Sequence, residues 1–192
     1  MKYFVKSIVR RFLGPYSAYR IYTWAAEDEA QPVNFPNDTF QVVPVDPSEI
    51  ARSISPLIQD QVNNAGPGSR VYACYEHGNI VSLCFYWFGD RYRQRNFVSL
   101  APGEAKLVQI VTIHERRGHG AASRLIAESC RAMAKEGYHR MYARIWHSNK
   151  ASIHAFERAG WSRAELILEF RPFFGIRPIR IKLKNRAAKS ST

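Results

Sequence analysis

The middle of the chain carries the run Val108-Gln-Ile-Val-Thr-Ile-His-Glu-Arg-Arg-Gly-His-Gly-Ala-Ala-Ser-Arg-Leu125. Its apolar, β-branched beginning predicts a buried strand, and the apolar spacing after Gly118 and Gly120 predicts a helix that Gly137 closes as a left-handed cap. Glycines let a backbone approach an anion, and the free N–H groups of a helix's first turn bind negative charge. The run therefore predicts a phosphate-binding turn, although a plain strand-to-helix turn fits so short a glycine pattern equally well.

A second informative run lies downstream, Ile145-Trp-His-Ser-Asn-Lys-Ala-Ser-Ile-His-Ala-Phe-Glu-Arg-Ala-Gly-Trp161. It predicts the end of a strand and then a short helix over residues 150–159, closed by Gly160. Together the two runs resemble the signatures of the GNAT (GCN5-related N-acetyltransferase) superfamily, whose acyl-CoA motif is Gln/Arg-x-x-Gly-x-Gly/Ala. The positions that match that motif, or match the second signature with conservative exchanges, are Arg117, Gly120, Ala122, Asn149, Ser152, Ile153, Glu157, Arg158, Gly160 and Trp161.

The glycine run differs from two other phosphate-binding patterns. It lacks the third glycine of the dinucleotide fingerprint, and no acidic residue follows at the distance where that fingerprint binds ribose. It also lacks the Gly-Lys-Ser/Thr of a P-loop. Because both signatures occur in the expected order and on the expected elements, the GNAT resemblance over residues 105–161 is the preferred interpretation.

The resemblance implies a GNAT fold, which is an α/β domain with a mixed, mostly antiparallel central sheet, splayed strands and flanking helices. In that fold the pantetheine arm of acetyl-CoA, or of another acyl-CoA, lies between the splayed strands like an additional strand. We expect this domain over residues 39–185, after a basic amphipathic segment and linker (1–38) and before a basic disordered tail (186–192). Acyl-CoA is then a co-substrate, and no metal is implied.

The resemblance also assigns roles to individual residues. Backbone groups of Ile110 and Thr112 would pair with the arm, and the Ile110 N–H would polarise the thioester carbonyl as an oxyanion hole does. Asn149 would hydrogen-bond the arm, and Phe156 stands where the family often has a tyrosine that protonates the departing thiolate. Backbone amides would hold the pyrophosphate at Arg117, Gly118, His119, Gly120, Ala121, Ala122 and Ser123.

An acceptor amine must lose a proton, so the site needs a general base. Glu104, at the approach to the central strand, is the first candidate because the family often places a carboxylate there, and a solvated loop carboxylate is the alternative. His114 and Glu115 belong to the phosphate end, and Glu76 belongs to the tip of a hairpin. Water or the Ser152 hydroxyl would replace the missing tyrosine, since a thiol with a pKa of about 8.5 leaves tolerably without full protonation.

The rest of the chain predicts further strands and helices in an α/β order. Pro56 is expected to interrupt a helix that begins at Asp46-Pro47, and an irregular loop with Arg91, Arg93 and Arg95 is a candidate clamp for an anionic substrate. The expected strands are 40–45, 70–76, 80–88, 106–113, 140–146, 163–170 and 176–183, and the expected helices are 118–136 and 150–159.

The formal net charge of +12 is concentrated at the two ends. Residues 1–24 carry five basic and no acidic side chains, residues 171–192 carry seven and none, and the rest is formally neutral. The first 13 residues have helical spacing of Phe4, Ile8 and Phe12 opposite basic residues. We therefore expect the ends to contact an anionic surface, such as the inner face of a membrane, while packing on the core or on a second subunit remains an alternative.

Compartment and partners follow from similar evidence. No apolar run approaches the ~20 residues of a membrane span, and no signal peptide is evident, so a cytoplasmic location is expected. Three cysteines without metal-ligand spacing are expected to be buried and reduced. The expected partner is a small-molecule amine, with an amino sugar of envelope polysaccharide as the preferred class, and homodimers or an acyl carrier protein as donor are further alternatives. A degenerate acyl-CoA-binding or nucleic-acid-binding protein is the competing hypothesis, but the basic charge is not interleaved through the body as nucleic-acid binding requires.

Overall fold

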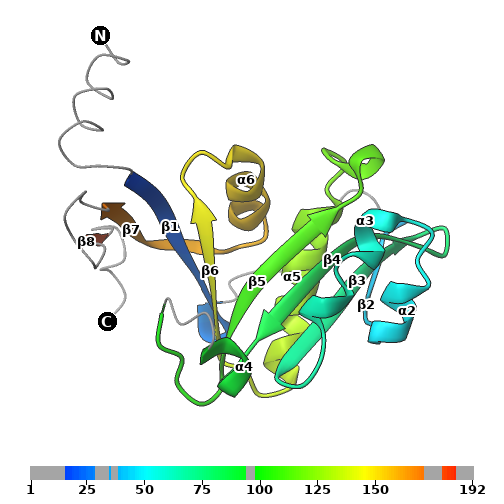
Figure 1. Cartoon of the computed structure of the whole chain (residues 1–192), viewed down its shortest axis with the longest axis horizontal. Helices are drawn as coiled ribbons and strands as arrows, with labels where there is room; N and C mark the ends of the chain where they lie inside the picture. Colours follow the sequence, from blue (N-terminus) through cyan, green and yellow to red (C-terminus); the bar gives the residue numbers. More distant parts are fainter. Residues whose placement is uncertain (1–15, 29–34, 36–38, 94–97, 171–178, 185–192) are drawn as a thin grey trace, which may run out of the picture.

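The structure is a computed structural model that describes residues 16–28, 35, 39–93, 98–170 and 179–184 (Figure 1). It contains a mixed sheet in the order β2-β3-β4-β5-β6-β1-β7-β8, in which only β5 and β6 run parallel. The predicted α/β class with a mostly antiparallel sheet is thus confirmed. The strands are β1 (Tyr16–Ala25), β2 (Gln41–Pro44), β3 (Ser69–Glu76), β4 (Asn79–Trp87), β5 (Glu104–Thr112), β6 (Arg140–Trp146), β7 (Ser162–Phe170) and β8 (Ile179–Lys184).

Helices cover both faces of the β2–β5 half of the sheet. On one face, α5 (Ala121–Lys135) buries Leu125, Ile126 and Met133 against β2–β5 and contacts α6 (Lys150–Arg158). On the other face, α2 (Pro47–Ala51) and α3 (Pro56–Gln59) bury Ile50 and Ile58 against β3 and β4. The two faces are distinct because successive strand side chains point to opposite sides of a sheet. Pro56 begins α3, so the predicted interruption of the first helix is confirmed.

Residues 16–25 correct the expected start of the domain. The sequence analysis places this aromatic stretch in the N-terminal segment, but it forms β1, which pairs with β6 on one side and with β7 on the other. Its side chains are buried on both faces, including Tyr19, Ile21, Tyr22 and Trp24. The boundary drawn after residue 38 therefore cuts through the sheet. The basic segment before residue 16 and the tail after residue 184 lie outside the described residues.

The central parallel pair separates along its length. Pairing between β5 and β6 runs from Glu104↔Arg140 to Leu107↔Ala143 and stops there. At the same level the register of β5 against β4 shifts, so that one extra residue, Val108, is inserted between the partners of Phe85 and Tyr86. A bulge of this kind bends the strand that carries it and increases its local twist. The bulge thus directs the rest of β5 away from β6 and opens a gap between the two strands.

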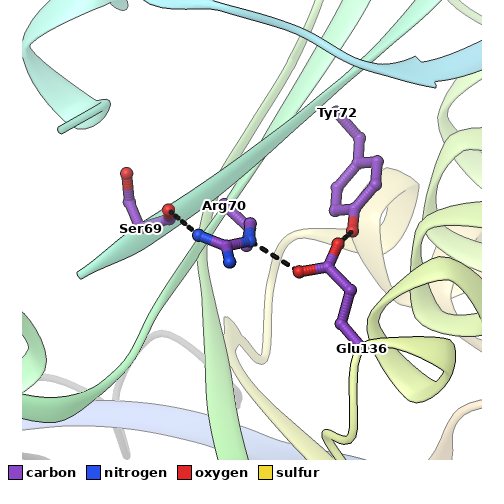
Figure 2. A network of polar contacts seen from close by, with 4 residues as sticks. All are labelled: Ser69, Arg70, Tyr72 and Glu136. Carbon is purple, nitrogen blue, oxygen red and sulfur yellow. Dashed lines mark hydrogen bonds and ion pairs between the residues drawn. The ribbon is translucent and has the colours of Figure 1, made fainter. Parts of the chain in front are cut away.

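A polar network joins the C-terminal end of α5 to β3 (Figure 2). Glu136 accepts hydrogen bonds from Arg70 Nε at 2.6 Å and from the Tyr72 hydroxyl at 2.8 Å. Burial disfavours the charged form of Glu136, but these two partners outweigh it and hold the pKa of the carboxyl below its ordinary value of 4.5. The network fixes the far end of α5, so the orientation of its opposite, N-terminal end is also defined.

In the described part of the chain, no helix is both long and apolar enough to span a membrane.

Candidate functional site

A cavity of about 580 Å³ lies where β5, the glycine turn, α5 and α6 meet. It begins at the separated end of β5, passes the first turn of α5 and continues along α6. Its volume is within the range of small-molecule and cofactor sites. The residues that line it are Ile110, Val111, Thr112, Arg116, Arg117, Gly118, Gly120, Ala121, Ala122, Ser123, Ile126, Asn149, Ala151, Ser152, His154, Ala155, Phe156 and Arg158.

The glycine turn has the geometry that an anion site needs. Gly118 and Gly120 have φ values of 82° and 89°, a conformation that other L-residues adopt only at a cost of about 1–2 kcal/mol. A side chain built at either position would meet no atom within 4 Å, so the space in front of the turn is open. Gly120 is also the N-cap of α5 and provides no side-chain cap, which leaves the N–H groups of the first turn directed at the cavity. The helix dipole adds a partial positive charge at this end.

Two arginines flank this turn. Arg117 donates from Nε to the carbonyl oxygen of Thr112 at 3.2 Å, and Arg116 forms an ion pair with the half-buried Glu76 at the tip of the β3–β4 hairpin. The ion pair joins the turn to the hairpin. Glu76 therefore has a structural partner, Arg116. The sequence analysis missed Arg116 as a lining residue, although its place beside the glycines is a visible signal for a basic contact with a phosphate.

The edge of β5 that faces the gap carries backbone groups that pair with no other strand in the described part of the chain. Ile113 donates its N–H to the Val81 carbonyl of β4 at 3.0 Å. Because backbone groups alternate sides along a strand, Val111 also faces β4, whereas Ile110 and Thr112 present their N–H and C=O groups to the side of β6. Strand β6 has already diverged at this level. The structure therefore offers the backbone of Ile110 and the N–H of Thr112 for pairing with an extended ligand between the two strands, while the Thr112 carbonyl already accepts from Arg117.

The N-terminal end of α6 forms the opposite wall. Asn149 is the N-cap, and its side-chain oxygen accepts the Ser152 N–H at 3.1 Å, which leaves the amide nitrogen as the available donor. Phe156 is 2% exposed, and its ring lies 4.9 Å from that of Trp161 and 6.3 Å from that of Tyr22. The side chain of Phe156 is thus an apolar wall, without the hydroxyl that a tyrosine would supply. His154 and Arg158, which the sequence analysis missed as cavity residues, are four residues apart on the same helix face.

A second, smaller cavity of about 150 Å³ occupies the gap between the strands. It shares Ile110, Asn149, Ser152 and Phe156 with the first cavity, so the two are adjacent. From β6 it is lined by consecutive residues, whose side chains alternate between the two faces of the sheet. The gap therefore connects the face covered by α5 and α6 to the opposite face. Its remaining lining residues are Leu107, Val108, Gln109, Ala143, Arg144, Ile145 and Trp146.

Glu104 is not brought to either cavity. It begins β5, six residues before Ile110, which corresponds to roughly 20 Å along an extended strand. Its carboxylate accepts the Ala101 N–H at 2.8 Å and the Tyr142 hydroxyl at 3.0 Å and is 9% exposed. Burial, followed by this bond to Glu104, raises the pKa of Tyr142. These contacts give Glu104 a structural role at the paired end of β5 and β6, in contrast to the expected catalytic one.

The other candidate acids and bases are also outside the cavities. His114 and Glu115 lie in the exposed turn after β5, and the His119 side chain is exposed and absent from the lining, so only its backbone belongs to the glycine turn. Among the described residues, no aspartate or glutamate lines either cavity.

The expected arginine clamp does not form at the gap. In place of an irregular loop, residues 89–93 form the short helix α4, which follows β4 at the level of the paired end of β5. Arg91 lies over the Trp87 ring at 4.6 Å and donates to the Asn63 carbonyl at 2.9 Å, and Arg93 pairs with Asp90 at 3.0 Å. Residue 95 lies outside the described residues.

Comparison with solved structures supports the same fold. Similar structures include a GNAT acetyltransferase of Colwellia psychrerythraea (TM-score 0.56, 14% identity, covering 88% of this chain and 61% of that one). Another is a GCN5-related N-acetyltransferase of Sphaerobacter thermophilus (TM-score 0.54, 13% identity, covering 90% of this chain and 56% of that one). A third is an acetyltransferase of Novosphingobium aromaticivorans (TM-score 0.51, 17% identity, covering 81% of this chain and 64% of that one). The chain thus spans about three fifths of the length of these structures, and at such identities the likeness shows the fold alone.

Sequence comparison identifies the family. A search of curated proteins finds no match. The model of the acetyltransferase (GNAT) family, however, matches residues 18–161, which include most of β1, the splayed strands, the glycine turn and α6. The match spans most of the chain and every lining residue of both cavities. The chain therefore belongs to the GNAT family of acetyltransferases.

Proposed function

We propose that this protein transfers an acetyl group, or another acyl group, from coenzyme A to a primary amine of a small molecule. The observation that carries the proposal is the continuous path from the glycine turn, along the edge of β5 at Ile110 and Thr112, to the gap beside β6. A glycine turn suited to phosphate at one end of the cleft and an open strand edge at the other match the pyrophosphate and the pantetheine arm of an acyl-CoA. Family membership supports the same general chemistry.

The residues present fit coenzyme A. Uncapped N–H groups of Ala121, Ala122 and Ser123 would receive the pyrophosphate, and the nearby arginines would balance its charge. Open space beside Gly118 and Gly120 leaves room for phosphate oxygens. When bound there, acetyl-CoA supplies a thioester from which an amine takes the acyl group as the thiol departs.

The chain's own contribution is positioning and charge stabilisation. The N–H of Ile110, directed at the gap, is placed to donate to an oxygen that becomes negative during acyl transfer. Asn149 fixes the arm by its amide nitrogen, and Phe156 excludes water from the reacting atoms. Ser152 lines both cavities, so its hydroxyl is our candidate proton donor toward a thiolate. The described lining holds no carboxylate, and its histidine, His154, belongs to the larger cavity and not to the gap, so we infer that the amine loses its proton to water.

A specific observation also favours a binding-only alternative. The site has phenylalanine at the family's tyrosine position and no carboxylate base in its described lining. A protein that binds acyl-CoA without transferring the acyl group would show the same glycine turn and the same strand edge. Turnover, as opposed to affinity, distinguishes the two functions.

The test measures release of free thiol from acetyl-CoA in the presence of amino sugars, amino acids, polyamines and aminoalkyl phosphates. We expect release that depends on one class of amine, with the N-acylated product identified by mass spectrometry. Tight binding of acetyl-CoA without any transfer would support the binding-only alternative. A parallel arm with acetylated acyl carrier protein decides whether the carrier protein is the donor.

A further inference from the structure

Aromatic and basic side chains are grouped beside the gap, on the face of the sheet opposite α5 and α6. On β6, Met141, Ala143 and Ile145 point into the core beneath α5 and α6. Arg144 and Trp146 alternate with them, so they lie on the opposite face, and both are exposed. The cofactor cavity and these two side chains are thus on opposite sides of the same opening.

Arg144 and Trp146 lie at the level along β6 where the thioester is expected. The last paired residues of β5 and β6 are Leu107 and Ala143. Ile110 and Trp146 are each three residues beyond that pair, roughly 10 Å along their strands. Both residues line the smaller cavity. A molecule seated on Trp146 can therefore extend an amine into the gap toward Ile110.

The group includes a third side chain, Tyr19 of β1, which is directly opposite Trp146 in the register. The two rings have centroids 4.5 Å apart, and the guanidinium of Arg144 lies over the Tyr19 ring at 5.0 Å. Tyr19 is 6% exposed, whereas Trp146 is 51% exposed. The buried tyrosine thus contacts both Arg144 and Trp146, and these two exposed side chains lie together beside the gap.

Arg144 also brings a positive charge to the lining of the opening. Arg144 is the one charged residue in the described lining of the smaller cavity. Glu165 of β7 is two strands away from Arg144. The two residues are in the same row across the sheet, since each is in register with Ile21 of β1. Glu104 is at the paired end, bonded to Tyr142. An anion at the gap would therefore meet a guanidinium, which binds carboxylate and phosphate groups with two parallel hydrogen bonds.

We propose that Arg144 and Trp146 form the acceptor-binding site, and that it selects primary amines that carry a carboxylate or phosphate on a body with a flat apolar face. Arg144 binds the anionic group, and Trp146 packs against the flat face, as exposed aromatic rings do in ligand sites. The inference rests on the proposed acyl transfer and specifies its acceptor.

The test compares matched amines that differ in the anionic group: glucosamine with glucosamine 6-phosphate, and tryptamine with tryptophan. The parent protein should prefer at least one anionic member, and the two pairs separate phosphate from carboxylate. Arg144→Gln should raise KM for the preferred anionic amine about tenfold or more, the range expected for a lost charge-assisted pair, with kcat nearly unchanged. KM for the neutral partner and the Kd of acetyl-CoA should stay the same. Arg144→Lys should restore part of the affinity.

Arg140→Gln is the matched control, because Arg140 is on the same strand and the same face but at the paired end, outside both cavities. It should leave the anionic preference intact. The proposal is overturned if Arg144→Gln affects neutral and anionic amines equally, or if the parent shows no anionic preference.

Calorimetry of glucosamine 6-phosphate and tryptophan, with coenzyme A present, gives a readout that does not need turnover. If acetyl-CoA binds but no amine is acylated, the proposed transfer fails. The acceptor site is then judged by calorimetry alone, and equal affinity of the parent and Arg144→Gln for both probes would overturn it.

Discussion

Glu104 and Ile110 belong to the same strand, but their separation gives the carboxylate a structural role. We expect Glu104→Gln to retain turnover within about threefold, since a lost general base would cost 10²-fold or more. The free energy of unfolding should fall by about 1–3 kcal/mol, because Tyr142 and the Ala101 N–H lose a charged acceptor. Steady-state rates and urea titrations check both. A hundredfold loss of rate at unchanged stability would restore Glu104 as the base.

At this scale the sequence predicts residues whose role is local. The glycine turn before α5 and the start of the short helix α6 depend on a few neighbouring residues, and both lie close to where the sequence predicts them. The position of a base depends on where β5 and β6 separate, which the bulge at Val108 determines. No pattern in the chain predicts that bulge, so the sequence does not show that Glu104 lies at the paired end of the two strands.

The tie between β3 and α5 gives an element-scale prediction about pH. The pKa of Glu136 is lower in the folded protein than its ordinary value, so the charged network stabilises the fold fully above that value. This stability is lost as the pH falls through the folded pKa. Glu136→Gln should therefore destabilise the protein near pH 7 and flatten the fall in its stability below about pH 4.5. Thermal unfolding from pH 3 to 7 measures both effects, and parallel curves for parent and variant would contradict this account.

Elements with a buried face and local end signals were predictable. The hairpin β3–β4 and helices α5 and α6 have both, and each was found within a few residues of its expected range. Strand β1, like β4, is buried on both faces and so lacks a period of two, but unlike β4 it has no hairpin partner next to it in the chain. Its partners, β6 and β7, are more than a hundred residues away in the chain, and no local pattern indicates such pairing.

On the scale of the whole molecule, the structure changes what the basic ends can contribute to a membrane contact. In β8, Arg180 and Lys182 alternate with exposed Ile179, Ile181 and Leu183, so their charge and the apolar surface are on opposite faces of the strand. Arg180 is paired with the buried Glu169 at 2.7 Å. We therefore propose that residues 1–14, outside the described part, supply most of any attraction to an anionic membrane.

Sedimentation with liposomes tests this proposal. The protein should pellet with anionic liposomes at low salt and be released at high salt, because screening weakens surface attraction. Deleting residues 1–14 should abolish most of the binding, whereas Lys182→Gln with Lys184→Gln should weaken it much less. Equal binding to neutral liposomes would exclude the electrostatic contact. An insoluble deletion variant would show that the segment packs on the core or on a second copy.

The central claim is that the glycine turn at the head of α5 holds the pyrophosphate of acetyl-CoA, and calorimetry of acetyl-CoA tests it most directly. Gly120→Glu places bulk and negative charge at the turn, and Gly137→Glu is its control at the other end of α5, with a φ of 93° against 89° and open space at both positions. Both variants carry similar backbone strain, of about 1–2 kcal/mol. We predict that Gly120→Glu weakens acetyl-CoA binding by more than about tenfold, while Gly137→Glu binds as the parent does. Equal affinity in all three proteins would contradict the assignment.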